Sequence, residues 1–127
     1  MKAARFLFVL LAALMLLACE GGIFVNGKVV GPDNRPISGA HLRLDRPEEP
    51  SARTFESASD KNGCFDIGGL DAPGVHTFTL HVTQPNFKDA TVQVSTEGAS
   101  DVVITLEPEN SRLSSKAAFV KTAPCGR

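Results

Sequence analysis

Two stretches of the chain alternate apolar and polar residues in a way that predicts half-buried β-strands. In AHLRLDR, residues 40–46, every second side chain from Ala40 to Leu44 is alanine or leucine. In HTFTLHVT, residues 76–83, every second side chain from Phe78 to Val82 is phenylalanine, leucine or valine. Because successive side chains of a strand point to opposite faces, each stretch would bury one face and expose the other.

The remaining sequence up to residue 107 follows the same plan of short strands between turns. Glycine, proline, aspartate and asparagine gather at residues 31–36, 60–63, 72–74 and 84–86, where they favour turns. No segment of useful length shows a helical period before residue 110. Seven strands are predicted: Ile23–Val30, Ala40–Arg46, Arg53–Ser59, Cys64–Gly68, His76–Thr83, Ala90–Ser95 and Val102–Glu107. Seven short strands at this spacing favour an all-β fold, a seven-stranded antiparallel Greek-key β-sandwich.

The first 18 residues have the three parts of an export signal. Lys2 and Arg5 form a short basic region, and residues 6–17 (FLFVLLAALMLL) form an unbroken apolar run. That run has the length of a signal-peptide core and is too short to span a bilayer comfortably. We therefore expect residues 1–18 to be a signal peptide.

Cys19 directly follows this apolar run. The small residues that an ordinary signal peptidase needs at −3 and −1 are poorly matched, because Leu16 stands at −3 and Ala18 at −1. The run Leu16-Leu17-Ala18-Cys19 instead resembles the bacterial lipobox. That resemblance implies that Cys19 becomes the acylated first residue of a mature lipoprotein, with residues 19–22 as its tether. The alternative is cleavage slightly downstream, which would leave Cys19 in the discarded signal.

The mature composition excludes several classes of partner. Removing Lys2 and Arg5 with the signal lowers the basic count from 13 to 11, against 14 acidic residues, a net charge of about −3. This charge does not favour binding to nucleic acid. No second apolar run is long enough to cross a membrane. The expected partners are a membrane, through the lipid, and an unidentified protein of the cell envelope.

Residues 25 to about 106 resemble the carboxypeptidase regulatory-like domain, a transthyretin-like β-sandwich. The resemblance is carried by VNGKVVGPDNRPISGAHLRL, SDKNGCFDIGGL and PGVHTFTLHVTQPNF, including Gly27 and Val29 in the first strand. The chain departs from the family where His76 replaces a tyrosine and where Asn86-Phe87 replaces a Gly-Tyr pair. Since Asn tolerates the left-handed backbone region, we expect the turn at Asn86 to survive.

The sequence offers no catalytic residues. Despite its name, the domain that it resembles is an accessory and not a peptidase. His41, His76 and His81 form no HExxH or HxxE pair, and no GxSxG motif is present. His41 and His81 face outward on their predicted strands and would make a surface metal pair only if those strands are neighbours; solvated surface histidines are the commoner arrangement. We therefore expect neither a metal site nor a cofactor.

A tyrosine-dependent hydrolase of the transthyretin-like fold is excluded, because the chain contains no tyrosine. DKNG at residues 60–63 reads as a β-turn and not as a calcium loop, because the twelfth position of an EF-hand loop would be Asp71 instead of Glu. A sugar-binding platform is disfavoured by the absence of Trp and Tyr. Among the phenylalanines, we expect Phe65, Phe78 and Phe87 in the core, with Phe24, Phe55 and Phe119 as exceptions.

The last 20 residues, 108–127, are expected to form a tail beyond a sandwich of residues 23–107. Leu113, Ala117 and Val120 have a weak helical spacing, and a frayed terminus is the default. Acylation of Cys19 would leave an even pair, Cys64 and Cys125, in an oxidising compartment, which favours a disulfide between them. The alternative is a buried Cys64 beside a free Cys125.

These expectations lead to a lipid-anchored, non-enzymatic β-sandwich that acts in the cell envelope as a structural or protein-interaction module. The residue after Cys19 is Glu20 and not Asp, which in a Gram-negative host favours the outer membrane, facing the periplasm. The alternative function is an envelope lipoprotein that binds a small ligand or a metal.

Overall fold

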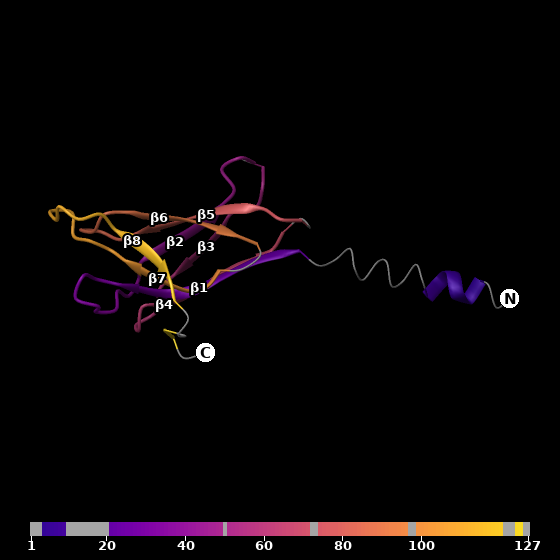
Figure 1. Ribbon diagram of the computed structural model, residues 1–127, viewed down its shortest axis with the longest axis horizontal. Coiled ribbons are helices and arrows are strands. Elements are labelled where there is room, and N and C mark those ends of the chain that lie inside the picture. The colour runs from indigo at the N-terminus through magenta and orange to yellow at the C-terminus, as the bar shows by residue number, and fades with distance from the viewer. Residues whose placement is uncertain are drawn as a thin grey trace.

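The computed structural model describes residues 4–9, 21–49, 51–71, 74–96, 99–120 and 124–125. Residues 4–9 form a short helical segment, and the rest of the described chain forms two layers of strands (Figure 1). The strands are β1 (Gly22–Val30), β2 (His41–Asp45), β3 (Phe55–Ala58), β4 (Cys64–Leu70), β5 (Thr77–Thr83), β6 (Ala90–Ser95), β7 (Ala99–Thr105) and β8 (Lys116–Phe119). The all-β sandwich predicted from the alternation is thus confirmed, with one more strand than expected.

The strands form two four-stranded sheets. Sheet A has the order β4-β1-β7-β8, and sheet B has the order β3-β2-β5-β6. All pairs in sheet B are antiparallel, with Leu44 opposite Leu80 at its centre. In sheet A, however, β1 and β7 run parallel, so the expectation of a purely antiparallel sandwich is wrong at this one pair. The alternation of apolar residues fixes which face of β7 is buried but not the direction in which β7 runs.

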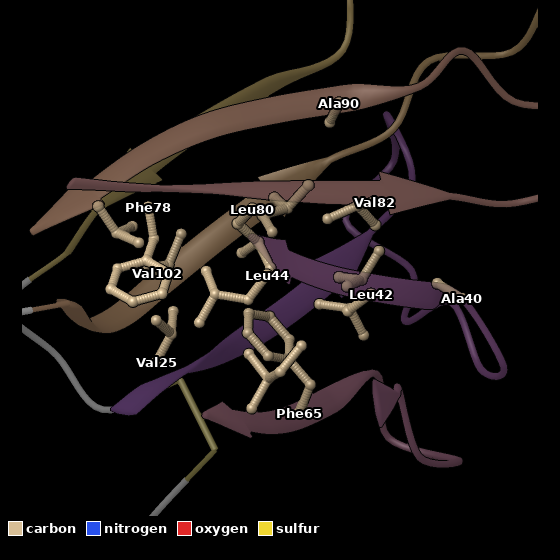
Figure 2. Close-up of a cluster of buried hydrophobic side chains, with 14 of the residues drawn as sticks. Val25, Ala40, Leu42, Leu44, Phe65, Phe78, Leu80, Val82, Ala90 and Val102 are labelled. Atoms are coloured by element: carbon tan, nitrogen blue, oxygen red, sulfur yellow. The ribbon is translucent and has the colours of Figure 1, made fainter. Parts of the chain in front are cut away.

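The core lies between the two sheets and contains the residues that the alternation predicted. Leu42, Leu44, Phe78, Leu80 and Val82 from sheet B are fully buried. They meet the inward side chains of sheet A, and Figure 2 shows this cluster in the space between the layers. From sheet A the core receives Ile23, Val25, Val29, Phe65, Ile67, Val102 and Ile104.

The parallel pair requires a close approach of two backbones at Gly27. This residue is opposite Val102, next to a register shift in the pairing of β1 with β7. A Cβ atom added to Gly27 would lie 1.9 Å from the carbonyl oxygen of Val102, far inside van der Waals contact. Only glycine fits here, which gives a physical reason for one of the residues that carry the resemblance noted in the sequence.

The expectation of a frayed tail is wrong for residues 116–119. They form β8, which pairs antiparallel with β7, from Val102 opposite Phe119 to Thr105 opposite Lys116. Ala117 packs against the core, and β8 covers an edge of β7 that would otherwise expose its backbone groups. The sandwich therefore extends beyond residue 107, and the weak helical spacing of Leu113, Ala117 and Val120 is not used.

Candidate functional site

The predicted bond between Cys64 and Cys125 is present as a disulfide. The two Cα atoms are 5.9 Å apart, and the cysteines are separated by 61 positions in the sequence. The third cysteine of the predicted sites, Cys19, lies outside the described residues, so its acylation stays a prediction.

The turn before β4 fixes the position of Cys64. The Asp60 side chain accepts hydrogen bonds from the backbone amides of Asn62 and Cys64, both at 2.9 Å. Gly63 closes the turn by donating to the Asp60 carbonyl at 2.9 Å and adopts a φ of +78°, which favours glycine. The carboxylate oxygen is thus used to cap backbone amides, as expected for a β-turn and not for a calcium loop.

The disulfide ties the C-terminal segment across the outer face of sheet A. Cys64 is opposite Lys28 on that face, and the Sγ atom of Cys125 lies 3.2 Å from the carbonyl oxygen of Gly27 in β1. β8 pairs with β7, on the other side of β1. β8 thus lies at one edge of the sheet, and Cys125, which follows it in the sequence, is bonded to β4 at the other edge.

The segment that leads into β8 is held by polar contacts at the turn after β7. The Ser115 hydroxyl accepts from the Glu107 amide at 2.9 Å and donates to the Lys88 carbonyl at 2.8 Å. The Lys88 ammonium donates to the carbonyl oxygens of Ser111, at 2.5 Å, and Leu113, at 2.8 Å. Residues 107–115 are thereby fixed to the loop between β5 and β6, which brings the chain back as β8.

His41 and His81 do lie on neighbouring strands, β2 and β5, on the outer face of sheet B. His41 is opposite Thr83 and Arg43 is opposite His81, so the two histidines are diagonal neighbours. Each already faces a carboxylate: His81 Nε2 is 3.2 Å from Asp45, and His41 Nε2 is 3.5 Å from Glu56. Within the described part of the chain, no three His, Cys, Asp or Glu residues gather as a metal site would require.

A shielded ion pair joins two loops at the end of the sandwich where β1 begins. Arg46, directly after β2, contacts Asp71 at 3.2 Å, and their side chains are only 10% and 8% exposed. The same guanidinium reaches the exposed Glu49 at 2.9 Å and lies 5.8 Å from the centre of the Phe78 ring. Sequence reasoning missed this cluster, because its members are 25 positions apart and lie in loops.

We expect Asp71→Ala to lower the free energy of unfolding by about 2–3 kcal/mol. Removing one partner of a buried pair leaves the other charge uncompensated, although Arg46 keeps Glu49 and so loses less than an isolated partner would. The matched control is Asp33→Ala, which removes an exposed pair with Arg35 at 2.9 Å and should cost less than about 1 kcal/mol. Urea unfolding measures both; equal losses would contradict a special role for the Arg46–Asp71 pair.

The phenylalanines divide into buried and exposed residues largely as expected from the sequence. Phe65 and Phe78 are buried, and Phe87 is half-buried against the core. Phe24 is 67% exposed, Phe119 is also exposed, and Phe55 is half-buried and packs on the core. The left-handed turn expected at Asn86 is confirmed, with a φ of +71°.

Two open hollows lie near the beginning of β1. One of about 270 Å³ is on the outer face of sheet A and is lined by Phe24, Val25, Asn26, Asp66, Ile67 and Gly68. The other, of about 300 Å³, is lined by Arg46, Glu48, Glu49, Val75, His76 and Thr77.

Comparison with known families decides between the possible β-sandwich classes. The family model of the carboxypeptidase regulatory-like domain matches residues 25–107. The chain belongs to this family. The resemblance to this domain stated from the sequence is thus confirmed.

The match to the carboxypeptidase regulatory-like domain has two consequences. This family is non-catalytic. The match ends at residue 107, so β8 and Cys125 lie beyond the matched segment. The C-terminal strand and its disulfide are therefore outside the segment that the family model matches.

One similar solved structure is that of 3-chlorocatechol 1,2-dioxygenase from Rhodococcus opacus 1CP. The identity is 10% and the TM-score 0.48, and the likeness covers 80% of this chain and 61% of the dioxygenase chain. This regulatory-like domain thus spans less than two thirds of the dioxygenase, and we draw nothing about activity from the likeness. Among the curated proteins, no match was found.

Proposed function

We propose that the protein is a lipid-anchored β-sandwich of the cell envelope that acts as a non-enzymatic structural or protein-interaction module. Cys19 carries the lipid, and residues 23–119 form the folded domain. In a Gram-negative host the domain faces the periplasm from the outer membrane, because Glu20 stands where Asp would favour retention in the inner membrane.

The observation that carries the anchor is the exposed apolar character of the segment before the lipobox. Phe6, Leu7, Phe8 and Val9 are 70–80% exposed in consecutive positions. A soluble domain does not leave such a run in water, whereas a signal segment offers it to lipid and to the export machinery. Among the described residues, none belongs to a helix that is long and apolar enough to span a membrane.

The disulfide supports export by an independent route. Disulfides form and persist in oxidising compartments and are rare in reducing ones. Cys64 and Cys125 are bonded to each other, which leaves Cys19, at the lipobox position, as the one cysteine outside the pair. The cysteine count thus fits one acylated residue and one bridge.

Two observations favour an interaction role over catalysis or metal binding. The family domain is non-catalytic. His41 and His81, the basis of the alternative metal-binding function, are engaged by Glu56 and Asp45. Contact with another molecule is therefore the function that the surface supports best.

Detergent partitioning tests the anchor, and a cross-linked pull-down from envelope extract tests the interaction. The wild-type protein is expected to enter the detergent phase, and Cys19→Ala is expected to stay in the aqueous phase or unprocessed with its signal, because the thiol that accepts the lipid is gone. Asp33→Ala, at an exposed position outside the signal, is a control that leaves the signal and the lipobox intact. Equal partitioning of Cys19→Ala and wild type would contradict the anchor, and a pull-down without any stoichiometric protein would contradict the interaction role.

A further inference from the structure

Exposed apolar side chains gather at one end of the sandwich. Phe24 in β1 is 67% exposed, Leu70 at the end of β4 is 65% exposed, and Val75 before β5 is 67% exposed. In Figure 1, β1 begins at the right-hand end of the sandwich, where the chain also passes from β4 to β5. Scattered single apolar residues are ordinary on a protein surface, but a group of large ones marks a contact site.

Strand register brings Phe24 and Leu70 together on the outer face of sheet A. Gly22 is opposite Leu70 and Phe24 is opposite Gly68, so Phe24 and Leu70 are diagonal neighbours on one face. A Cβ atom added to Gly22 would lie 3.1 Å from Cε2 of Phe24, so the phenyl ring leans back toward the beginning of β1. The glycines beside the two side chains leave them standing clear of the sheet.

The chain itself places this end beside the lipid. Cys19 is three residues from Gly22, the first residue of β1. Whatever conformation they take, three residues span at most about 10 Å. The domain therefore cannot move away from the surface in which Cys19 is held.

We propose that the apolar end formed by Phe24, Leu70 and Val75 rests on the bilayer that holds the Cys19 lipid. This inference depends on the proposed lipid anchor and adds a fixed orientation to it: the domain stands on this end. The opposite end, with the turn at residues 107–115, then faces away from the membrane.

The charged residues at this end do not favour electrostatic attraction to a membrane, so the proposed contact depends on the apolar side chains. Glu48 and Glu49 are exposed and border the same hollow as Val75, while Arg46 is occupied by Glu49 and Asp71. Arg53 lies over the ring of Phe55, at 5.9 Å from its centre. A surface that exposes the carboxylates of Glu48 and Glu49 gains nothing from anionic lipid, so the contact needs no negatively charged headgroup and resists added salt.

Single-tryptophan fluorescence tests the orientation, because the chain contains no Trp or Tyr. The acylated full chain is incorporated in phosphatidylcholine vesicles with or without brominated acyl chains. Leu70→Trp is compared with Leu113→Trp, since both leucines are 65% exposed. Leu70 ends β4, whereas the Leu113 carbonyl is bound by Lys88 in the loop after β5, away from the beginning of β5. We expect brominated lipid to quench Leu70→Trp at least twofold more strongly than Leu113→Trp, unchanged in 0.5 M salt.

A second substitution shows whether Phe24 takes part. Phe24→Ser in the Leu70→Trp protein should roughly halve the lipid quenching, whereas Phe119→Ser, at an exposed phenylalanine outside the group, should leave it unchanged. Thermal unfolding verifies that all variants are folded.

The outcomes separate this inference from the anchor. Acylated protein that floats with the vesicles but shows equal, weak quenching at both positions overturns the orientation and leaves the anchor standing. Shielding of Leu70→Trp from aqueous acrylamide without lipid quenching also overturns it, because a second copy of the chain would then cover this end. An N-terminus without acyl groups removes the anchor and the orientation together.

Discussion

The double variant Cys64→Ser, Cys125→Ser is expected to lose about 4 kcal/mol of unfolding free energy relative to the oxidised protein. The disulfide closes a loop of about 61 residues, and the chain-entropy model gives this value for a loop of that length. The Cα separation of 5.9 Å is in the ordinary range for a disulfide, so no rearrangement of the sandwich is needed to form it. Urea unfolding of the two proteins measures the difference.

Reduction of the wild-type protein is the control for this prediction. It removes the bridge without changing the sequence, and it should lower the stability as much as the double variant does. Amide hydrogen exchange should then speed up first at β8 and at Val120, whose amide donates to the backbone carbonyl of Asp101 at 2.9 Å. A loss below about 1 kcal/mol in both experiments would mean that the tail is held by β8 and Ser115 and not by the disulfide.

Leu80→Ala is expected to lower the free energy of unfolding by about 2–5 kcal/mol. Leu80 is fully buried at the centre of sheet B, opposite Leu44 and Val92, and its removal leaves a cavity that the two sheets cannot close. Gln93→Ala is the matched control on β6, because Gln93 is exposed and surface changes usually stay within about 0.5 kcal/mol. Similar losses for both variants would contradict the assignment of inner and outer faces.

The two faces of each strand could be predicted from the sequence, because period-2 alternation reports burial directly. Leu42, Leu44, Phe78, Leu80 and Val82 are all inside, as the pattern requires. The turns could also be predicted from the sequence, since Gly63 and Asn86 both adopt a positive φ where a turn was expected. Local chemistry thus determined the strands and most of their ends.

Features set by contacts between distant segments could not be predicted in this way. The parallel pairing of β1 with β7 joins residues about 75 positions apart, and alternation carries no information on strand direction. β8 forms because β7 offers it an edge and Cys64 holds the chain beyond it, whereas its own four residues, KAAF, are too few to indicate a strand. The pair Arg46–Asp71 likewise exists only after folding.

Of the candidate site, only the disulfide could be predicted from the sequence, because it required no more than a count of the cysteines. The even pair Cys64 and Cys125 followed from removing one cysteine by acylation. The apolar group at the beginning of β1 was missed, because Gly68-Gly69 read as the end of a strand that in fact continues to Leu70. Two more residues of pairing put the Leu70 side chain on the outer face, next to Phe24.

The central claim is that Cys19 is the first residue of a mature, acylated protein, and intact-mass analysis of the membrane-extracted chain tests it most directly. The account predicts a chain of residues 19–127 that carries a diacylglyceryl group and an amide-linked acyl chain on Cys19, and that lacks two hydrogens because of the Cys64–Cys125 disulfide. An unmodified N-terminus downstream of residue 19, or a chain that keeps residues 1–18, would contradict it.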